Sequence, residues 1–73
     1  MGEKIKDLST FIIQGHKVRI ELNDGYDKSY SKYDIHIQSD IIQYYLTDKD
    51  YMKMSSAVIT GMKKLQEQKK LKQ

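Results

Sequence analysis

The side chains best suited to proton transfer are two histidines, His16 and His36. A histidine works as a general base when a nucleophile or a carboxylate is fixed beside it. No Ser, Cys or carboxylate stands at a spacing that would place it next to His36, which we expect on the open face of a sheet. His16 follows Gly15 and falls in a predicted connection. We therefore predict no catalytic residue and a protein that is not an enzyme.

Carboxylate pairs are the next candidates for chemistry, as ligands for a metal ion. Asp48 and Asp50 form one pair, and Asp24 and Asp27 form another. Neither pair fits a calcium loop, which needs ligands at alternate positions and a closing Glu. Roles in turns and helix caps account for these residues, and the scattered glycines cannot form a phosphate-binding loop. We predict no metal and no cofactor.

Tyrosines provide the strongest indication of binding. Tyr45, together with Ile41, is predicted on the solvent-facing side of a strand, and Tyr26 and Tyr30 belong to a polar stretch. Exposed aromatic side chains are enriched at the centres of protein interfaces, and they can also stack on bases. The alternative is that Tyr33 and Tyr44 belong to the core and that Tyr26 and Tyr30 pack down as a loop lid.

Basic charge is concentrated near the C-terminus. Residues 1–62 carry 8 basic and 9 acidic side chains, whereas residues 63–73 carry 5 basic and 1 acidic. The basic side chains at the end are Lys63, Lys64, Lys69, Lys70 and Lys72. They suit the negative end of a helix dipole, and they are also the candidate phosphate contacts of a nucleic-acid-binding protein.

Size and composition limit the class of protein. A chain of 73 residues forms one domain, and without cysteine it has neither disulfides nor thiolate metal sites. No apolar run exceeds three residues, so we expect no membrane span or signal peptide and a cytoplasmic location. Twelve lysines against one arginine, with no proline, are typical of AT-rich genomes. A low-GC bacterium or one of its phages is the expected source.

The elements that must position these residues follow from hydrophobic spacing. Between residues 2 and 14, the apolar positions Ile5, Leu8, Phe11 and Ile12 form one helical stripe, which predicts a short helix ended by Gly15. The alternative is a strand that begins at Thr10, since Thr, Phe and Ile favour sheets.

Alternation of apolar and polar residues then predicts three antiparallel strands, at 17–22, 33–38 and 41–46. Asn23-Asp24-Gly25 ends the first strand, and Ser39-Asp40 marks a tight turn between the other two. The face expected in the core carries nine residues: Val18, Ile20, Leu22, Tyr33, Ile35, Ile37, Ile42, Tyr44 and Leu46.

A long C-terminal helix is predicted to begin at Thr47 or Asp48, with acidic residues in its first turn. Its apolar stripe runs from Tyr51 to Leu65, so residues 66–73 are expected to be an unpacked lysine-rich tail. Gly61 weakens a helix interior by about 1 kcal/mol relative to Ala, which a close approach of the helix to the sheet would explain.

The predicted fold is therefore α+β, a single α-β-β-β-α domain over residues 1–73 with both helices on one face of a three-stranded meander. This order resembles that of the double-stranded-RNA-binding domain, which would imply RNA as a ligand. In that family the second helix opens with lysines, and here Lys49 and Lys53 are interrupted by Asp48 and Asp50. The family's Gly-Pro-x-His loop has no counterpart around Asn23-Asp24-Gly25-Tyr26, so we do not assign the chain to it.

From these features we predict a non-enzymatic protein-binding module, of the kind used as an accessory or inhibitor protein by phages and mobile elements. The partner, or a second copy, is expected on the open sheet face or at a sheet edge. The residues predicted to contact it are Arg19, His36, Ile41, Gln43 and Tyr45. Nucleic-acid binding through the basic end of the helix is the alternative.

Overall fold

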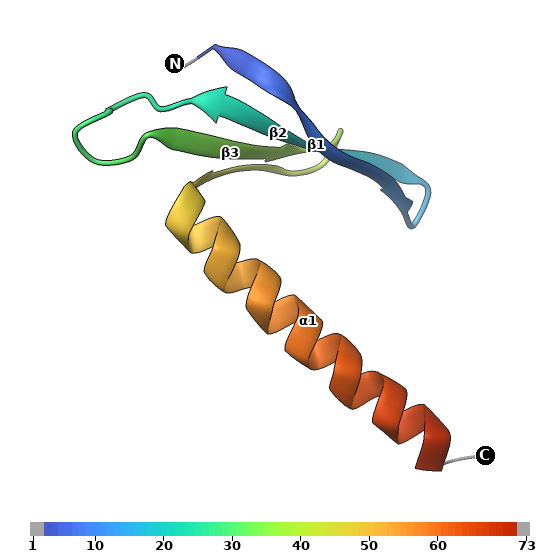
Figure 1. Ribbon diagram of the computed structural model, residues 1–73. Helices are drawn as coiled ribbons and strands as arrows, with labels where there is room; N and C mark the ends of the chain where they lie inside the picture. The colour runs from blue at the N-terminus through green and yellow to red at the C-terminus, as the bar shows by residue number, and fades with distance from the viewer. Residues whose placement is uncertain (1–2, 72–73) are drawn as a thin grey trace.

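The computed structural model describes residues 3–71 and contains a four-stranded antiparallel sheet followed by one long helix (Figure 1). The strands follow the chain in the order β1-β2-β3-β4. Their bounds are β1 Lys4–Ile13, β2 His16–Asp24, β3 Tyr33–Gln38 and β4 Gln43–Thr47, and α1 spans Asp48–Leu71. The fold is α+β, as predicted. Within the described part of the chain, no helix combines the length and the apolar character needed to cross a membrane.

The predicted N-terminal helix is wrong, because residues 4–13 form strand β1, paired antiparallel with β2. Gln14 and Gly15 join the two strands, both with positive φ, at 51° and 80°. Such two-residue turns match the twist of a hairpin and fix its register. The pairing shifts between Lys4 and Lys6 and again between Asp7 and Ser9. These irregularities interrupt the alternation of apolar and polar residues in β1. Its apolar residues therefore fall at spacings that are typical of a helix.

The sheet therefore has four strands in place of the predicted three. β3 occupies the predicted residues, and β2 extends the predicted strand by one residue at its start and two at its end. β4 begins at Gln43, two residues later than predicted, which leaves Ile41 in the β3–β4 turn. Ser39 closes that turn, since its amide donates to the Ile42 carbonyl (2.8 Å) and its hydroxyl accepts from the Ile41 and Ile42 amides.

Helix α1 begins where the sequence predicts. The Asp50 amide donates to the Thr47 hydroxyl oxygen (3.2 Å), which caps the first turn. The helix continues to Leu71, so it includes most of the segment that was expected to be an unpacked tail. This last part of the helix does not contact the sheet. Nothing lies within 4 Å of a Cβ built on Gly61, so the predicted close approach of the helix to the sheet there is wrong.

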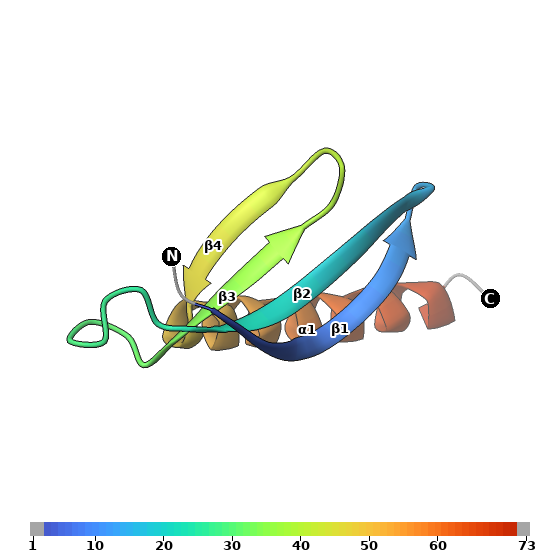
Figure 2. The ribbon, with the colours of Figure 1, turned by 90° about the horizontal axis from the view of Figure 1, so that it is seen from above.

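The sheet has two different faces, set by strand alternation and cross-strand pairing. The apolar face carries Phe11 from β1 and the predicted core residues of β2, β3 and β4, namely Val18, Ile20, Leu22, Tyr33, Ile35, Ile37, Tyr44 and Leu46. Helix α1 lies on this side and runs below the sheet when the molecule is seen from above (Figure 2). It diverges from the sheet along its length (Figure 1).

The core is much smaller than predicted. On the apolar face only Val18 and Ile35 are buried, at 8% and 2% exposure, and Ile42 and Tyr44 are more than half exposed. No residue of α1 is buried, and α1 contacts β3 and β4 alone. The expected roof of two helices over one sheet face is therefore wrong. With one helix after four strands, the topology behind the resemblance to the double-stranded-RNA-binding domain is absent too.

Candidate functional site

The polar face of the sheet, opposite α1, is ordered into three cross-strand rows. Because directly opposed residues of antiparallel strands share a face, the pairing of β2, β3 and β4 defines the rows. They are Arg19–Gln38–Gln43, Glu21–His36–Tyr45 and Asn23–Asp34–Thr47. We use "polar face" for these nine residues. Four of the five predicted partner contacts lie on it, in two neighbouring rows, and only Ile41 lies outside.

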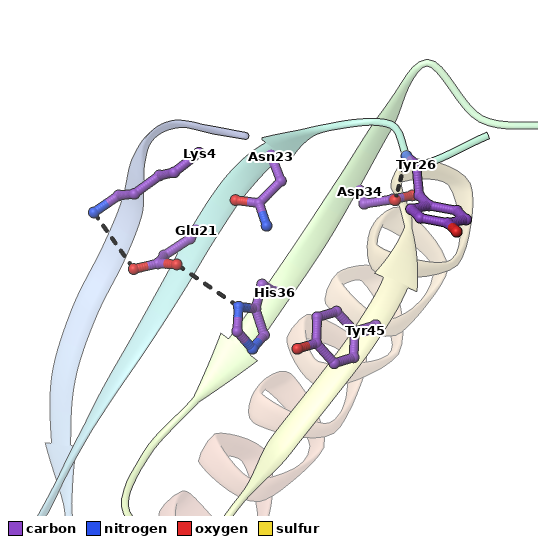
Figure 3. Close-up of a pocket in the computed structure, with 7 residues that line it drawn as sticks. All are labelled: Lys4, Glu21, Asn23, Tyr26, Asp34, His36 and Tyr45. Carbon is purple, nitrogen blue, oxygen red and sulfur yellow. Dashed lines mark hydrogen bonds and ion pairs between the residues drawn. The ribbon is translucent and has the colours of Figure 1, made fainter. Parts of the chain in front are cut away.

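The middle row is held together by charge and stacking (Figure 3). One Glu21 carboxylate oxygen lies 3.4 Å from the Lys4 ammonium, and the other lies 3.7 Å from His36 Nδ1. The His36 and Tyr45 rings are stacked, with centroids 4.3 Å apart and planes inclined by 12°. The Glu21 and His36 side chains are only 10% and 13% exposed, whereas Tyr45 is 54% exposed. The largely buried Glu21 and His36 side chains thus lie beside an exposed aromatic ring.

A pocket of about 440 Å³ lies over this row and the next. Its lining residues come from β1 to β4 and from the loop after β2: Lys4, Glu21, Asn23, Tyr26, Asp34, His36 and Tyr45 (Figure 3). Tyr26 is fixed at the rim, because its backbone amide donates to the Asp34 carboxylate (2.9 Å). Two buried polar atoms here, Asn23 Oδ1 and His36 Nε2, have no hydrogen-bond partner in the described structure. The walls therefore offer polar groups as well as aromatic surface.

Both signs of charge meet at the β1 edge of the site. The Lys4 ammonium contacts the Asp7 carboxylate (2.8 Å) as well as Glu21. The hydrogen bond to Asp7 raises the pKa of Lys4 above its ordinary value, and Lys4 in turn lowers the pKa of Asp7. The charges of Arg19 and Lys17 also lower the pKa of Asp7, so the surface is charged but mixed in sign.

The loop between β2 and β3 is braced by its own side chains. The Ser29 amide and hydroxyl both donate to the Asp27 carboxylate, at 3.1 and 2.6 Å, which lowers the pKa of Asp27. Gly25 leaves room for the returning chain, since an added Cβ would stand 2.1 Å from the Ser31 carbonyl oxygen. This loop carries Tyr26 and Tyr30, both about three-quarters exposed.

The remaining predicted residues lie apart from this site. His16 begins β2 and pairs with the Asp40 carboxylate (2.7 Å) beyond the other end of the sheet. Ile41 is 64% exposed in the β3–β4 turn. Lys63, Lys64, Lys69 and Lys70 are exposed on α1, and Lys72 lies outside the described residues. Within residues 3–71, no cluster of three His, Cys, Asp or Glu side chains could hold a metal ion.

Sequence reasoning missed Lys4 and Tyr26 as parts of the site. Lys4 was assigned to a helix, so its position beside Glu21 was not apparent. Tyr26 is four residues past the predicted end of its strand, and only the loop path places it at the rim. Glu21 and Asp34 were expected on the open face, but nothing in the spacing indicated that Glu21 would orient His36.

Comparisons with known proteins add no assignment: no family model, no curated protein and no solved structure matches the chain. The functional conclusions therefore depend on the geometry of the chain itself.

Proposed function

We propose that this chain is a small non-enzymatic protein-binding module whose polar face receives a protein partner. The observation that carries the proposal is the Glu21–His36–Tyr45 row, in which an exposed aromatic ring is supported by a buried pair. Tyrosine and arginine anchors dominate binding energy when their surroundings are rigid and able to exclude water. Tyr45 and Arg19 lie in adjacent rows of one rigid sheet.

Charge favours a protein over a nucleic acid at this face. Phosphate binding needs a surface of one sign, because affinity grows with the number of phosphates neutralised. Here Lys4 is paired with two carboxylates, Asp7 and Glu21, and Asp34 adds a third negative charge at the pocket. A protein surface with its own mixed charges and hydrogen-bond donors is the better complement.

Photo-crosslinking from position 45 tests the proposal. Tyr45 is replaced by a photoreactive phenylalanine analogue, and the purified protein is irradiated in a lysate of the organism that encodes it, before and after nuclease treatment. The expected result is one discrete protein adduct that survives nuclease and is reduced in an Arg19→Ala background. The matched control places the same analogue at Thr60, on α1. An adduct that disappears with nuclease, or the same adducts from both positions, would contradict the proposal.

Nucleic-acid binding by the α1 lysines was the alternative, and the helix gives it less support. At 100° per residue, Lys63 and Lys70 point within about 20° of each other, whereas Lys64 and Lys69 point about 100° or more away from both of them and from each other. The four side chains therefore do not form one track. A salt titration decides the matter. Binding to DNA or RNA that weakens steeply with salt and is lost in a Lys63→Ala, Lys64→Ala double variant would favour the alternative.

A further inference from the structure

The surface left uncovered is larger than a stable single chain of this size exposes. The chain has 6183 Å² of accessible surface, whereas a folded monomer of 8.6 kDa has about 4,700 Å². Its radius of gyration is 15.1 Å, compared with about 11 Å for a compact domain of this length. The excess of about 1,500 Å² exceeds the roughly 800 Å² that each partner contributes to a standard interface.

Exposed apolar side chains include residues on helix α1 and on the face of the sheet that is turned toward it. On the helix, Met54, Val58, Ile59, Met62 and Leu65 are 39–62% exposed, and on the sheet Phe11 and Tyr44 are 42% and 59% exposed. Helix α1 cannot close onto the sheet through a hinge, because β4 ends at Thr47 and α1 begins at Asp48. An outside surface must cover these side chains.

Helix α1 carries two adjacent apolar seams, each with the 3–4 spacing of helix packing. The first seam is Tyr51, Met54, Val58, Gly61 and Leu65, and the second is Met52, Ser55, Ile59 and Met62. The half-buried residues Asp48, Tyr51 and Ser55 indicate which side of the helix faces the sheet. The second seam is centred within about 30° of that side and the first seam about 70° away from it, so the first seam beyond the half-buried Tyr51 is available to another helix.

We propose that this first seam, with the apolar face of the sheet beside it, is covered by a second copy of the chain in a two-fold symmetric dimer with antiparallel α1 helices. In full antiparallel register Met54 lies opposite the partner's Leu65, and Val58 lies opposite the partner's Gly61. A large side chain thus faces the residue without one, which permits close packing and accounts for a glycine that contacts nothing within one chain.

Charge supports the same arrangement. The first turn of α1 is acidic, with Asp48 and Asp50, and its last turn is basic, with Lys69 and Lys70. An antiparallel pair brings each acidic turn to the partner's basic turn and places Asp48 beside the partner's Lys69 on the same flank of the seam, while a parallel pair would place like charges together. A structure with so small a core needs its partner to be present as soon as the chain is made. A second copy of the same chain meets this condition.

The first test is the mass of the full-length protein in solution by sedimentation equilibrium. We expect twice the chain mass of 8.6 kDa at concentrations down to about the micromolar range. A monomer at about 100 μM, or an assembly larger than a dimer, would overturn the proposal. A monomer would also mean that a different protein covers the apolar surface.

The second test locates the contact between the two helices by disulfide crosslinking. The 73 residues contain no cysteine, so each introduced cysteine is the only one in its chain. Val58→Cys is near the two-fold axis on the first seam, so mild oxidation should link two copies within the roughly 7 Å that a disulfide spans. Thr60→Cys is the matched control, because it is even nearer to the axis along the helix but lies on the opposite side of the helix. Linkage at Thr60 as fast as at Val58 would remove the proposed interface.

The direction of the helices is tested with Met54→Cys and Leu65→Cys. In the antiparallel register each position is about 16 Å along the axis from its own equivalent, so neither variant alone should form a linked dimer. A mixture of the two should. Linked homodimers from each variant alone, with no gain on mixing, would show parallel helices and would overturn the proposal.

Discussion

The ring of Tyr45 lies flat against the ring of His36 across the β3–β4 pair, at a centroid distance of 4.3 Å. The two residues are direct cross-strand partners, so the backbone register brings the rings together. Glu21, the next residue in the row, holds His36 from the other side. The exposed tyrosine is therefore part of the sheet's side-chain packing, and its position is fixed before any partner arrives.

This stacking predicts a measurable coupling between the two rings. In a double-mutant cycle of His36→Ala and Tyr45→Ala, the free energies of unfolding should differ from additivity by about 0.5–1.5 kcal/mol, as expected for stacked aromatic pairs. Tyr45→Phe keeps the stack and should leave stability unchanged within about 0.5 kcal/mol. Urea denaturation measures both. A cycle that closes within error would show that the rings act independently.

The tight packing around Gly25 predicts that adding one methyl group there will strongly destabilise the protein. In Gly25→Ala the Cβ would meet the Ser31 carbonyl oxygen at 2.1 Å and the Lys32 carbonyl oxygen at 2.9 Å, and both belong to the backbone. The loop must therefore shift, and we expect a loss of about 2 kcal/mol or more in the free energy of unfolding. Lys28→Ala, in the same loop, is the control and should cost less than about 0.5 kcal/mol. Equal stability of the two variants would contradict this account of the loop.

The lowered pKa values of Asp7 and Asp27 predict that the protein loses stability in acid. The pKa of Asp7 is lowered mainly by the hydrogen bond from Lys4, and the pKa of Asp27 mainly by that from the Ser29 hydroxyl, from an ordinary value of 3.8. A folded pKa below the unfolded one stabilises the protein fully above the unfolded value, and this contribution is lost as the pH falls through the folded pKa. Unfolding free energies measured at a series of pH values should therefore decrease below about pH 4. In Asp27→Asn the decrease should be smaller, and an unchanged acid dependence would exclude a role for Asp27.

How well the sequence predicts this fold depends on the regularity of each strand. β2 and β3 alternate without interruption, so Val18, Ile35 and their neighbours could be assigned to one face and Arg19 and His36 to the other. β1 contains two shifts of register, and Ile5 and Leu8 fall at these shifts. An extra residue in a strand changes its period locally, so periodicity alone favoured a helix there. Gln14-Gly15 between β-favouring residues was the signal for a hairpin.

The site could be predicted only in part, because strand phase specifies a face but not the contacts on it. Arg19, His36, Gln43 and Tyr45 were placed together by alternation, and their cross-strand neighbours required the observed register. Lys4 joins the site through a strand that was not predicted. The helix stripe was assigned to the core because a single-chain reading has no other place for apolar residues, whereas Val58 and Leu65 remain 62% and 56% exposed.

The charge at the two ends of α1 provides a final prediction, which depends on the proposed dimer. Lys69→Glu places a carboxylate beside the partner's Asp48 at two symmetric positions, so the dimer should dissociate on the order of tenfold more readily at low salt. Adding Asp48→Lys restores opposite charges, and the double variant should recover most of the lost affinity. Lys64→Glu, on the polar side of the same helix, is the matched control and should change the dissociation constant less than about twofold. If Lys69→Glu and Lys64→Glu weaken the dimer equally, net charge rather than antiparallel register governs association. The double variant has the wild-type net charge, so it is compared with Lys64→Glu combined with Asp48→Lys, which has the same net charge. Recovery in the Lys69 double variant but not in the Lys64 one, measured by sedimentation at two salt concentrations, indicates a register-specific pair, whereas equal recovery in both indicates a net-charge effect.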